Sequence, residues 1–148
     1  MNSYRQILYH IVFCTHRRLE TIPEAHQDEL YRYIWSIIKT NKSILYRING
    51  TSNHIHILCD LHPTVALSHL LKEIKVKSNY WMKRTGKFPL FTSWSEGSCV
   101  LTYTYRDKNM IVNYIKNQKK HHANVAFENE YISLLQEHGV DYDEKYLF

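Results

Sequence analysis

ILYRINGTSNHIHILC, residues 44–59, is the stretch that decides the fold. Two short runs rich in apolar residues, ILYRI at 44–48 and HIHILC at 54–59, lie on either side of an Asn-Gly pair at 49–50. An Asn-Gly pair between such runs is the strongest short signal for a β-hairpin, because both residues tolerate the positive φ of a tight turn. The stretch therefore predicts two adjacent antiparallel strands with their turn at 49–50.

Strand and helix patterns alternate on both sides of this hairpin. In chain order the predicted elements are a strand over 4–14, a helix opened by Pro23, the two hairpin strands, a helix over 64–85 capped by Thr64, a strand over 99–105, a helix from Asp107 to about 118–122, and a last helix over 127–139. The order is β-α-β-β-α-β followed by C-terminal helices, which predicts an α+β fold with a ferredoxin-like or RRM-like antiparallel sheet. No repeat or linker interrupts it, so we expect residues 1–148 to form a single domain with an acidic C-terminal extension over 127–148.

The composition is that of an ordinary globular chain, with 44% hydrophobic and 22% charged residues among 148. The longest apolar runs are a few residues, too short to span a bilayer, and the first residues lack the continuous apolar stretch of a signal peptide. Cys14, Cys59 and Cys99 are few, odd in number and without Cys-x-x-Cys spacing, which favours a reducing compartment and argues against a cysteine-built zinc site. We therefore expect a cytoplasmic protein with no membrane attachment.

Charge is distributed unevenly along the chain. Residues 1–127 carry 18 Lys and Arg against 8 Asp and Glu, whereas residues 128–148 carry 1 against 6. A basic body suits a polyanionic partner such as nucleic acid. The alternative is a solvated surface whose charge the acidic tail only balances.

His54 and His56 are candidate metal ligands. Residues i and i+2 of a strand point to the same face, roughly 6.6 Å apart along the chain, so the two imidazoles can aim at one point while Ile55 and Ile57 face the core. A divalent metal needs at least one further ligand. His62 lies too far along the chain to continue this geometry.

The segment MIVNYIKNQKKHH, residues 110–122, holds a second candidate pair. Tyr114 and Gln118 are four residues apart and are neighbours on one face of a helix. The alternative for Tyr114 is a half-buried core aromatic alongside Ile111 and Ile115.

Together, these segments resemble the single-tyrosine HUH transposases, the insertion-sequence-200-like family that includes the REP-associated tyrosine transposases. The stretches that carry the resemblance are YHIVFCTHRR at 9–18, NHIHILCDLHP at 53–63, FPLFTSWSEG at 88–97, YIKNQKKHH at 114–122 and FENEYISLLQEHGVDYDEKYLF at 127–148. The resemblance extends over nearly the whole chain and implies a ferredoxin-like fold.

The resemblance implies a role for each candidate residue. His54 and His56 become the metal ligands, Gln118 the third ligand and Tyr114 the nucleophile that forms a 5′-phosphotyrosyl intermediate. His121 and His122 follow Gln118 closely and are alternatives for the third ligand. The implied cofactor is Mg²⁺ or Mn²⁺, and the implied substrate is single-stranded DNA containing a hairpin. The family protein is a dimer whose tyrosine helix can complete the partner's site, so Tyr114 and the histidines need not meet within one chain.

Basic residues along the chain are candidates for binding DNA phosphates. They are Arg17, Arg18, Lys72, Lys75, Lys77, Lys83, Arg84, Lys116 and Lys119. Lys116 and Lys119 also lie close enough in sequence to Tyr114 to favour its phenolate. Phe91 and Trp94 are candidates for stacking on unpaired bases, with core packing as the alternative for at least one of them.

Three rival functions fit parts of the pattern. An RRM-like module that holds RNA or single-stranded DNA without cleaving it shares the topology, although the glycine-and-aromatic RNP signature is missing. A domesticated, inactive transposase relative would bind DNA only. A small metal-dependent phosphoesterase would use water in place of Tyr114.

Overall fold

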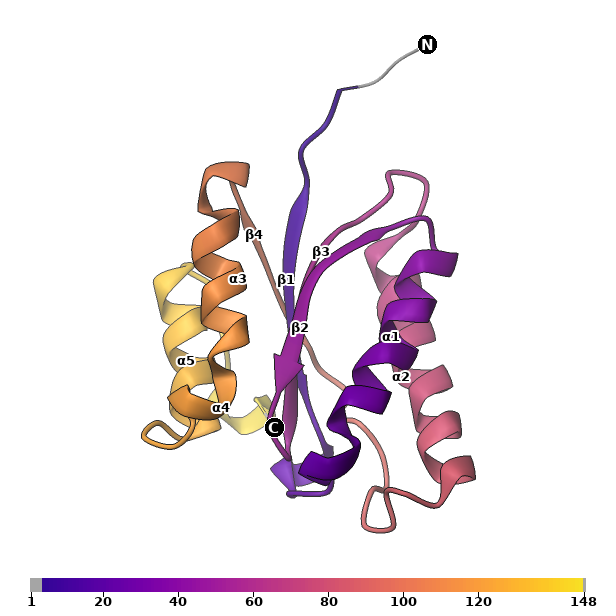
Figure 1. The fold of residues 1–148 in the computed structure, drawn as a ribbon. Helices are drawn as coiled ribbons and strands as arrows, with labels where there is room; N and C mark the ends of the chain where they lie inside the picture. The colour runs from indigo at the N-terminus through magenta and orange to yellow at the C-terminus, as the bar shows by residue number, and fades with distance from the viewer. Residues whose placement is uncertain (1–3, 148) are drawn as a thin grey trace.

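A four-stranded antiparallel sheet forms the centre of the computed structural model, which describes residues 4–147 (Figure 1). Its strands are β1 Leu8–Cys14, β2 Ile44–Gly50, β3 His54–Asp60 and β4 Cys99–Tyr103. They lie side by side in the order β2-β3-β1-β4. This is the strand order of the split βαβ arrangement, so the expected ferredoxin-like α+β fold is confirmed.

Helices cover both faces of the sheet (Figure 1). One face carries α1 Gln27–Thr40 and α2 Leu67–Thr85, and the other carries α3 Lys108–Lys116, α4 Gln118–His121 and α5 Phe127–Glu137. Short 3₁₀ turns lie at His16–Arg18, Glu24–His26, Tyr105–Asp107 and Glu144–Tyr146. Among the helices of residues 4–147, none has the length and apolar character needed to cross a membrane.

Side-chain alternation along β3 separates the two buried layers. Ile55 and Ile57 pack in the core under α1 and α2, as expected from the sequence. His54 and His56 point to the opposite face and are also fully buried, because α3, α4 and α5 cover that face. Strand β3 therefore presents isoleucines to one layer and two buried histidines to the other.

The predicted position of the hairpin turn is wrong. Strand β2 continues through Asn49 and Gly50, which pair with His56 and Ile55, and the chain turns at residues 51–53. A Cβ on Gly50 would lie 3.0 Å from the carbonyl carbon of His54 and from Cα of Ile55, and closer still to the carbonyl oxygen of His54. Gly50 is thus present for close approach of two strands rather than for a turn conformation.

Two predicted helices have different boundaries in the structure. The helix expected from Thr64 begins at Leu67, and the Thr64 hydroxyl contacts Nδ1 of His62 at 2.7 Å. The helix expected from Asp107 to about 118–122 is interrupted at Asn117, whose φ of −95° and ψ of 17° separate α3 from α4. Its two halves still lie on the same face of the sheet (Figure 1).

Phe91 and Trp94 are both buried, so the structure places them in the core under α1 and α2 rather than on a base-stacking surface. The indole Nε1 of Trp94 donates a hydrogen bond of 2.9 Å to the hydroxyl of Ser78 on α2. The loop that precedes β4 is therefore part of the scaffold.

Candidate active site

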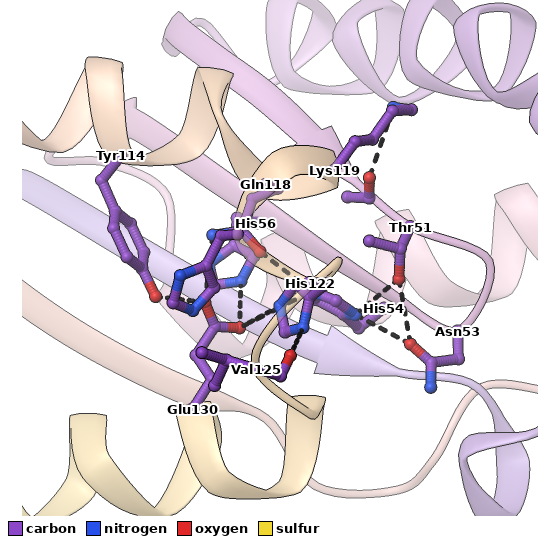
Figure 2. Close-up of polar contacts among 12 residues, drawn as sticks. Thr51, Asn53, His54, His56, Tyr114, Gln118, Lys119, His122, Val125 and Glu130 are labelled. Atoms are coloured by element: carbon purple, nitrogen blue, oxygen red, sulfur yellow. Dashed lines mark hydrogen bonds and ion pairs between the residues drawn. The ribbon is translucent and has the colours of Figure 1, made fainter.

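His54 begins β3 and has defined partners on its outer side (Figure 2). Its Nδ1 lies 2.8 Å from Oδ1 of Asn53 and 3.0 Å from the hydroxyl of Thr51. Because an amide oxygen only accepts hydrogen bonds, this contact places the ring proton on Nδ1 and leaves the lone pair of Nε2 directed inward. The amide nitrogen of Asn53 donates to the backbone oxygen of Arg18 at 3.3 Å, which ties this support to the 3₁₀ turn that follows β1.

His56 is supported by a third histidine that the sequence analysis missed. Nδ1 of His56 lies 2.8 Å from Nε2 of His10 on β1, and the two rings stack with centroids 5.0 Å apart. Burial, followed by the charge of His56, lowers the pKa of His10 well below its ordinary value. Burial is also the main reason that the pKa of His54 is lowered, so both rings are held neutral. The signal for His10 was its place in the Leu8-His10-Val12 face of β1, which the sequence analysis did not use.

Tyr114 on α3 and Gln118 on α4 both reach the histidines despite the interruption between the helices. The amide Oε1 of Gln118 lies 3.1 Å from Nε2 of His54, and the Tyr114 ring centroid lies 5.7 Å from that of His56. Asn49 fixes this segment to the sheet, because its amide donates to the backbone oxygen of Lys116 at 3.0 Å. The structure therefore brings all four predicted residues together within one chain.

Glu130 on α5 lies at the centre of the group and was not predicted (Figure 2). Its Oε1 is 2.9 Å from Nε2 of His56, 2.9 Å from Nε2 of His122 and 3.6 Å from Nε2 of His54. Its Oε2 accepts a hydrogen bond of 3.0 Å from the Gln118 amide and another from the Tyr114 hydroxyl. The sequence does hold a signal, since Glu130 falls at helical spacing among apolar residues that are buried on α5.

The charge of Glu130 controls the neighbouring groups. Burial opposes its ionisation, but hydrogen bonds from His122 and His56 outweigh burial and hold the pKa of Glu130 below its ordinary value. Burial, and then the negative charge of Glu130, raise the pKa of Tyr114 well above that of a free tyrosine. Tyr114 is therefore a neutral phenol in this state.

The donor set fits a divalent metal ion. Donor atoms of His54, His56, His122 and Glu130 all lie within 4.8 Å of one another, and Oε1 of Gln118 faces the same point. Of the two histidines proposed as alternatives to Gln118, only His122 contributes to this group. Nε2 of His121 instead lies 3.3 Å from Oε2 of Glu130.

The predicted DNA-binding residues divide between two faces and several are already engaged. Helix α2, which carries Lys72, Lys75, Lys77, Lys83 and Arg84, packs on the sheet face opposite the candidate active site (Figure 1). Lys75 donates to the backbone oxygens of residues 95, 96 and 97 at 2.9, 3.1 and 3.1 Å.

Near the active site, Lys119 donates to Oδ1 of Asn49 at 2.8 Å, so it points toward the end of β2 and away from Tyr114 (Figure 2). Arg18 forms an ion pair of 2.7 Å with Glu128. Arg17 and Lys116 are exposed, and Arg17 has a strained φ of 54°.

A cleft of about 700 Å³ opens beside the donor group. Thr51, Asn53, Lys119 and His122 line it, together with Arg18 and Glu128. His122 belongs both to the cleft and to the donor group, so the cleft borders the group at this residue.

The antiparallel sheet, the His54-Ile55-His56 strand and the tyrosine helix beside it define a transposase of the HUH class. The family described as Transposase IS200 like matches residues 3–118, most of the chain, and the chain belongs to this family. The matched range includes both strand histidines, Tyr114 and Gln118, and it ends before His122 and Glu130.

Two solved structures share the fold. A provisionally assigned transposase from Deinococcus radiodurans R1 has a TM-score of 0.62 and 23% identity, covering 80% of this chain and 95% of its own. A REP-associated tyrosine transposase bound to a REP hairpin has a TM-score of 0.59 and 19% identity, covering 84% of this chain and 76% of its own. A comparison with curated protein sequences finds no significant match.

Proposed function

We propose that this transposase cleaves and rejoins single-stranded DNA through a covalent 5′-phosphotyrosyl link on Tyr114 and moves a small insertion element. The proposal rests on one observation: the Tyr114 hydroxyl lies, within one chain, beside the same buried point as the candidate metal-ligand atoms of His54, His56 and Gln118 (Figure 2). Membership in the transposase family supports the same chemistry.

Tyr114 acts as the nucleophile in this proposal. Its phenol oxygen forms a bond to phosphorus while the bond from phosphorus to the 3′ oxygen breaks, and the proton lost by the phenol is balanced by one gained by the 3′ oxygen. The energy of the phosphodiester is retained in the tyrosine–phosphorus bond. The 3′-OH of another strand can therefore reverse the step without ATP, so one tyrosine used twice cuts and rejoins.

His54, His56 and Gln118 are the ligands we propose for Mg²⁺ or Mn²⁺. The fit rests on the donor atoms, because these side chains offer two imidazole nitrogens and an amide oxygen that carry no charge of their own. When bound, the ion polarises a non-bridging phosphate oxygen and stabilises the leaving 3′ oxygen. Imidazole-rich sites suit Mn²⁺ better than Mg²⁺, which prefers oxygen ligands and retained waters.

We propose single-stranded DNA with a hairpin as the substrate, in keeping with the hairpin-bound relative of the same fold. The cleft that His122 lines is where we propose that the strand approaches the site. Arg17, Lys116 and the exposed basic residues of α2 are available for phosphate contacts away from that path. Affinity is then expected to fall steeply as salt concentration rises.

A homodimer in the cytoplasm completes the proposal. Strands β2 and β4 are the edges of the sheet, and a second copy is one way to cover such an edge. Light scattering should then show about twice the 17.8 kDa chain mass. The buried free cysteines Cys14, Cys59 and Cys99 agree with a reducing compartment.

The decisive experiment is detection of a covalent adduct. Wild-type protein incubated with a labelled hairpin-containing single strand and Mn²⁺ should acquire a label that survives boiling in detergent, and the released fragment should end in 3′-OH. Tyr114→Phe should bind the same DNA and form no adduct, because only the hydroxyl is lost. The matched control is Tyr103→Phe, a half-buried tyrosine that neighbours His10 on the same sheet face, which should react normally.

Each alternative function gives a different result. Cleavage by Tyr114→Phe without an adduct identifies a water-using phosphoesterase. Binding without cleavage by the wild type identifies a non-cleaving module or an inactive relative. Either result overturns the proposal.

A further inference from the structure

We propose that Glu130, together with His122, completes the divalent-metal site begun by His54 and His56, with Oε1 of Glu130 as a direct ligand. This inference rests on the proposed function and adds to it two ligands from the C-terminal segment, beyond the residues that match the transposase family.

Three imidazole nitrogens converge on one carboxylate oxygen. Nε2 of His56 and Nε2 of His122 both lie 2.9 Å from Oε1 of Glu130, and Nε2 of His54 lies 3.6 Å from it. Ligands bound at about 2.0–2.2 Å to a common ion are themselves roughly 3–4 Å apart. The group needs only small shifts to surround one cation.

The outer hydrogen bonds of the rings prepare this arrangement. Nδ1 of His122 lies 2.6 Å from the backbone oxygen of Val125, and Nδ1 of His54 lies 2.8 Å from the amide oxygen of Asn53. Both partners can only accept, so in the neutral rings the proton is on Nδ1 and a lone pair is on Nε2. Outer partners of this kind are typical of metal-bound histidine, because they orient the ring and direct Nε2 at the ion, which would replace the Nε2 proton that otherwise donates to Glu130.

The position of Glu130 in α5 supports the same role. Glu130 is only 4% exposed and shares the buried face of the helix with Phe127, Tyr131 and Leu134. Burial of a carboxylate is costly unless it is paired or coordinates a metal. A residue that served only to dock α5 on the sheet would be better apolar.

The two oxygens of Glu130 then have different tasks. Oε1 faces the ring nitrogens, while Oε2 accepts hydrogen bonds from the Tyr114 hydroxyl and the Gln118 amide. One side chain thereby sets the position of the nucleophile relative to the metal. With Glu130 and His122 added to His54, His56 and Gln118, the site has three imidazole nitrogens, and the third nitrogen strengthens the expected preference for Mn²⁺ over Mg²⁺.

The test is a direct measurement of Mn²⁺ binding in the absence of DNA, by calorimetry and by the electron paramagnetic resonance signal of free Mn²⁺. Glu130→Gln keeps the size and removes the charge, and it should weaken Mn²⁺ binding by about tenfold or more. His122→Gln provides a second variant if Glu130→Gln does not fold, and it should weaken binding in the same direction. The control is Glu137→Gln, at the exposed end of the same helix, which should bind as the wild type does.

Two results overturn the inference. Wild-type affinity in folded Glu130→Gln means that the carboxylate is not a ligand. Tighter binding means that Glu130 blocks the site in competition with the metal. Failure of the proposed function is separate, because it appears as a missing DNA adduct whatever the affinity for Mn²⁺.

Discussion

Gly50→Ala is expected to destabilise the protein by crowding the start of β3. A Cβ at this position meets backbone atoms, 3.0 Å from C of His54 and 3.0 Å from Cα of Ile55, and lies nearer still to the His54 carbonyl oxygen. Backbone atoms cannot rotate away as a flexible side chain would, so the two strands must separate. Overpacking of this kind costs about 1–3 kcal/mol, and this contact belongs at the upper end of that range.

The assay is urea unfolding of the metal-free protein, with Gly97→Ala as the matched control. A Cβ on Gly97 meets nothing within 4 Å, so this variant should stay within about 0.5 kcal/mol of the wild type. Because His54 begins β3, Gly50→Ala should also weaken Mn²⁺ binding, whereas Gly97→Ala should not. Equal unfolding midpoints for the two variants would refute the close-approach argument.

Three further outcomes are expected. Metal-free protein should lose stability as the pH falls from 7.5 to 5.5, because burial lowers the folded-state pKa values of His10 and His54. The unfolded chain then takes up protons first, below about pH 6.5, and the loss is up to about 1.4 kcal/mol per pH unit for each ring. Constant or rising stability in urea titrations would contradict neutral buried rings. Lys75→Met should lower the free energy of unfolding, measured by heat or urea, by about 1–3 kcal/mol, because three backbone oxygens lose their donor. Lys72→Met should change stability little and should lower both the affinity for DNA and its salt dependence. Similar stabilities of the two variants would show that the Lys75 contacts do not stabilise the fold. EDTA should abolish adduct formation by the wild type, and Mn²⁺ should restore it at a lower concentration than Mg²⁺; full activity in EDTA would remove the metal from the mechanism.

Local sequence patterns were sufficient to predict the sheet and part of the candidate active site. Alternation places Ile55 and Ile57 on one side of β3 and His54 and His56 on the other, because successive side chains of any strand point to opposite faces. Helical spacing between Tyr114 and Gln118 put both on one side of the chain even though the helix is interrupted between them. These relations depend only on near neighbours in sequence.

The hairpin turn shows where local reasoning stops. Asn49-Gly50 has the composition of a tight turn, but its role depends on one contact with a distant segment and on the register of the hairpin itself. The Asn49 amide binds the backbone of Lys116, and Gly50 lies against the backbone of β3. The partner of Asn49 lies outside residues 44–59, and the close approach at Gly50 follows from the strand register rather than from residue type.

Sequence by itself determined the α+β order, the paired histidines and the tyrosine with its glutamine, since each depends on side-chain periodicity over a short stretch of chain. Only the tertiary structure decided that His10, His122 and Glu130 join them, because these residues lie on β1, after α4 and on α5 and meet only when the C-terminal helices cover one face of the sheet. It also decided that the basic face of α2 lies away from the nucleophile, since a helix pattern specifies which side is buried but not which face of the sheet buries it.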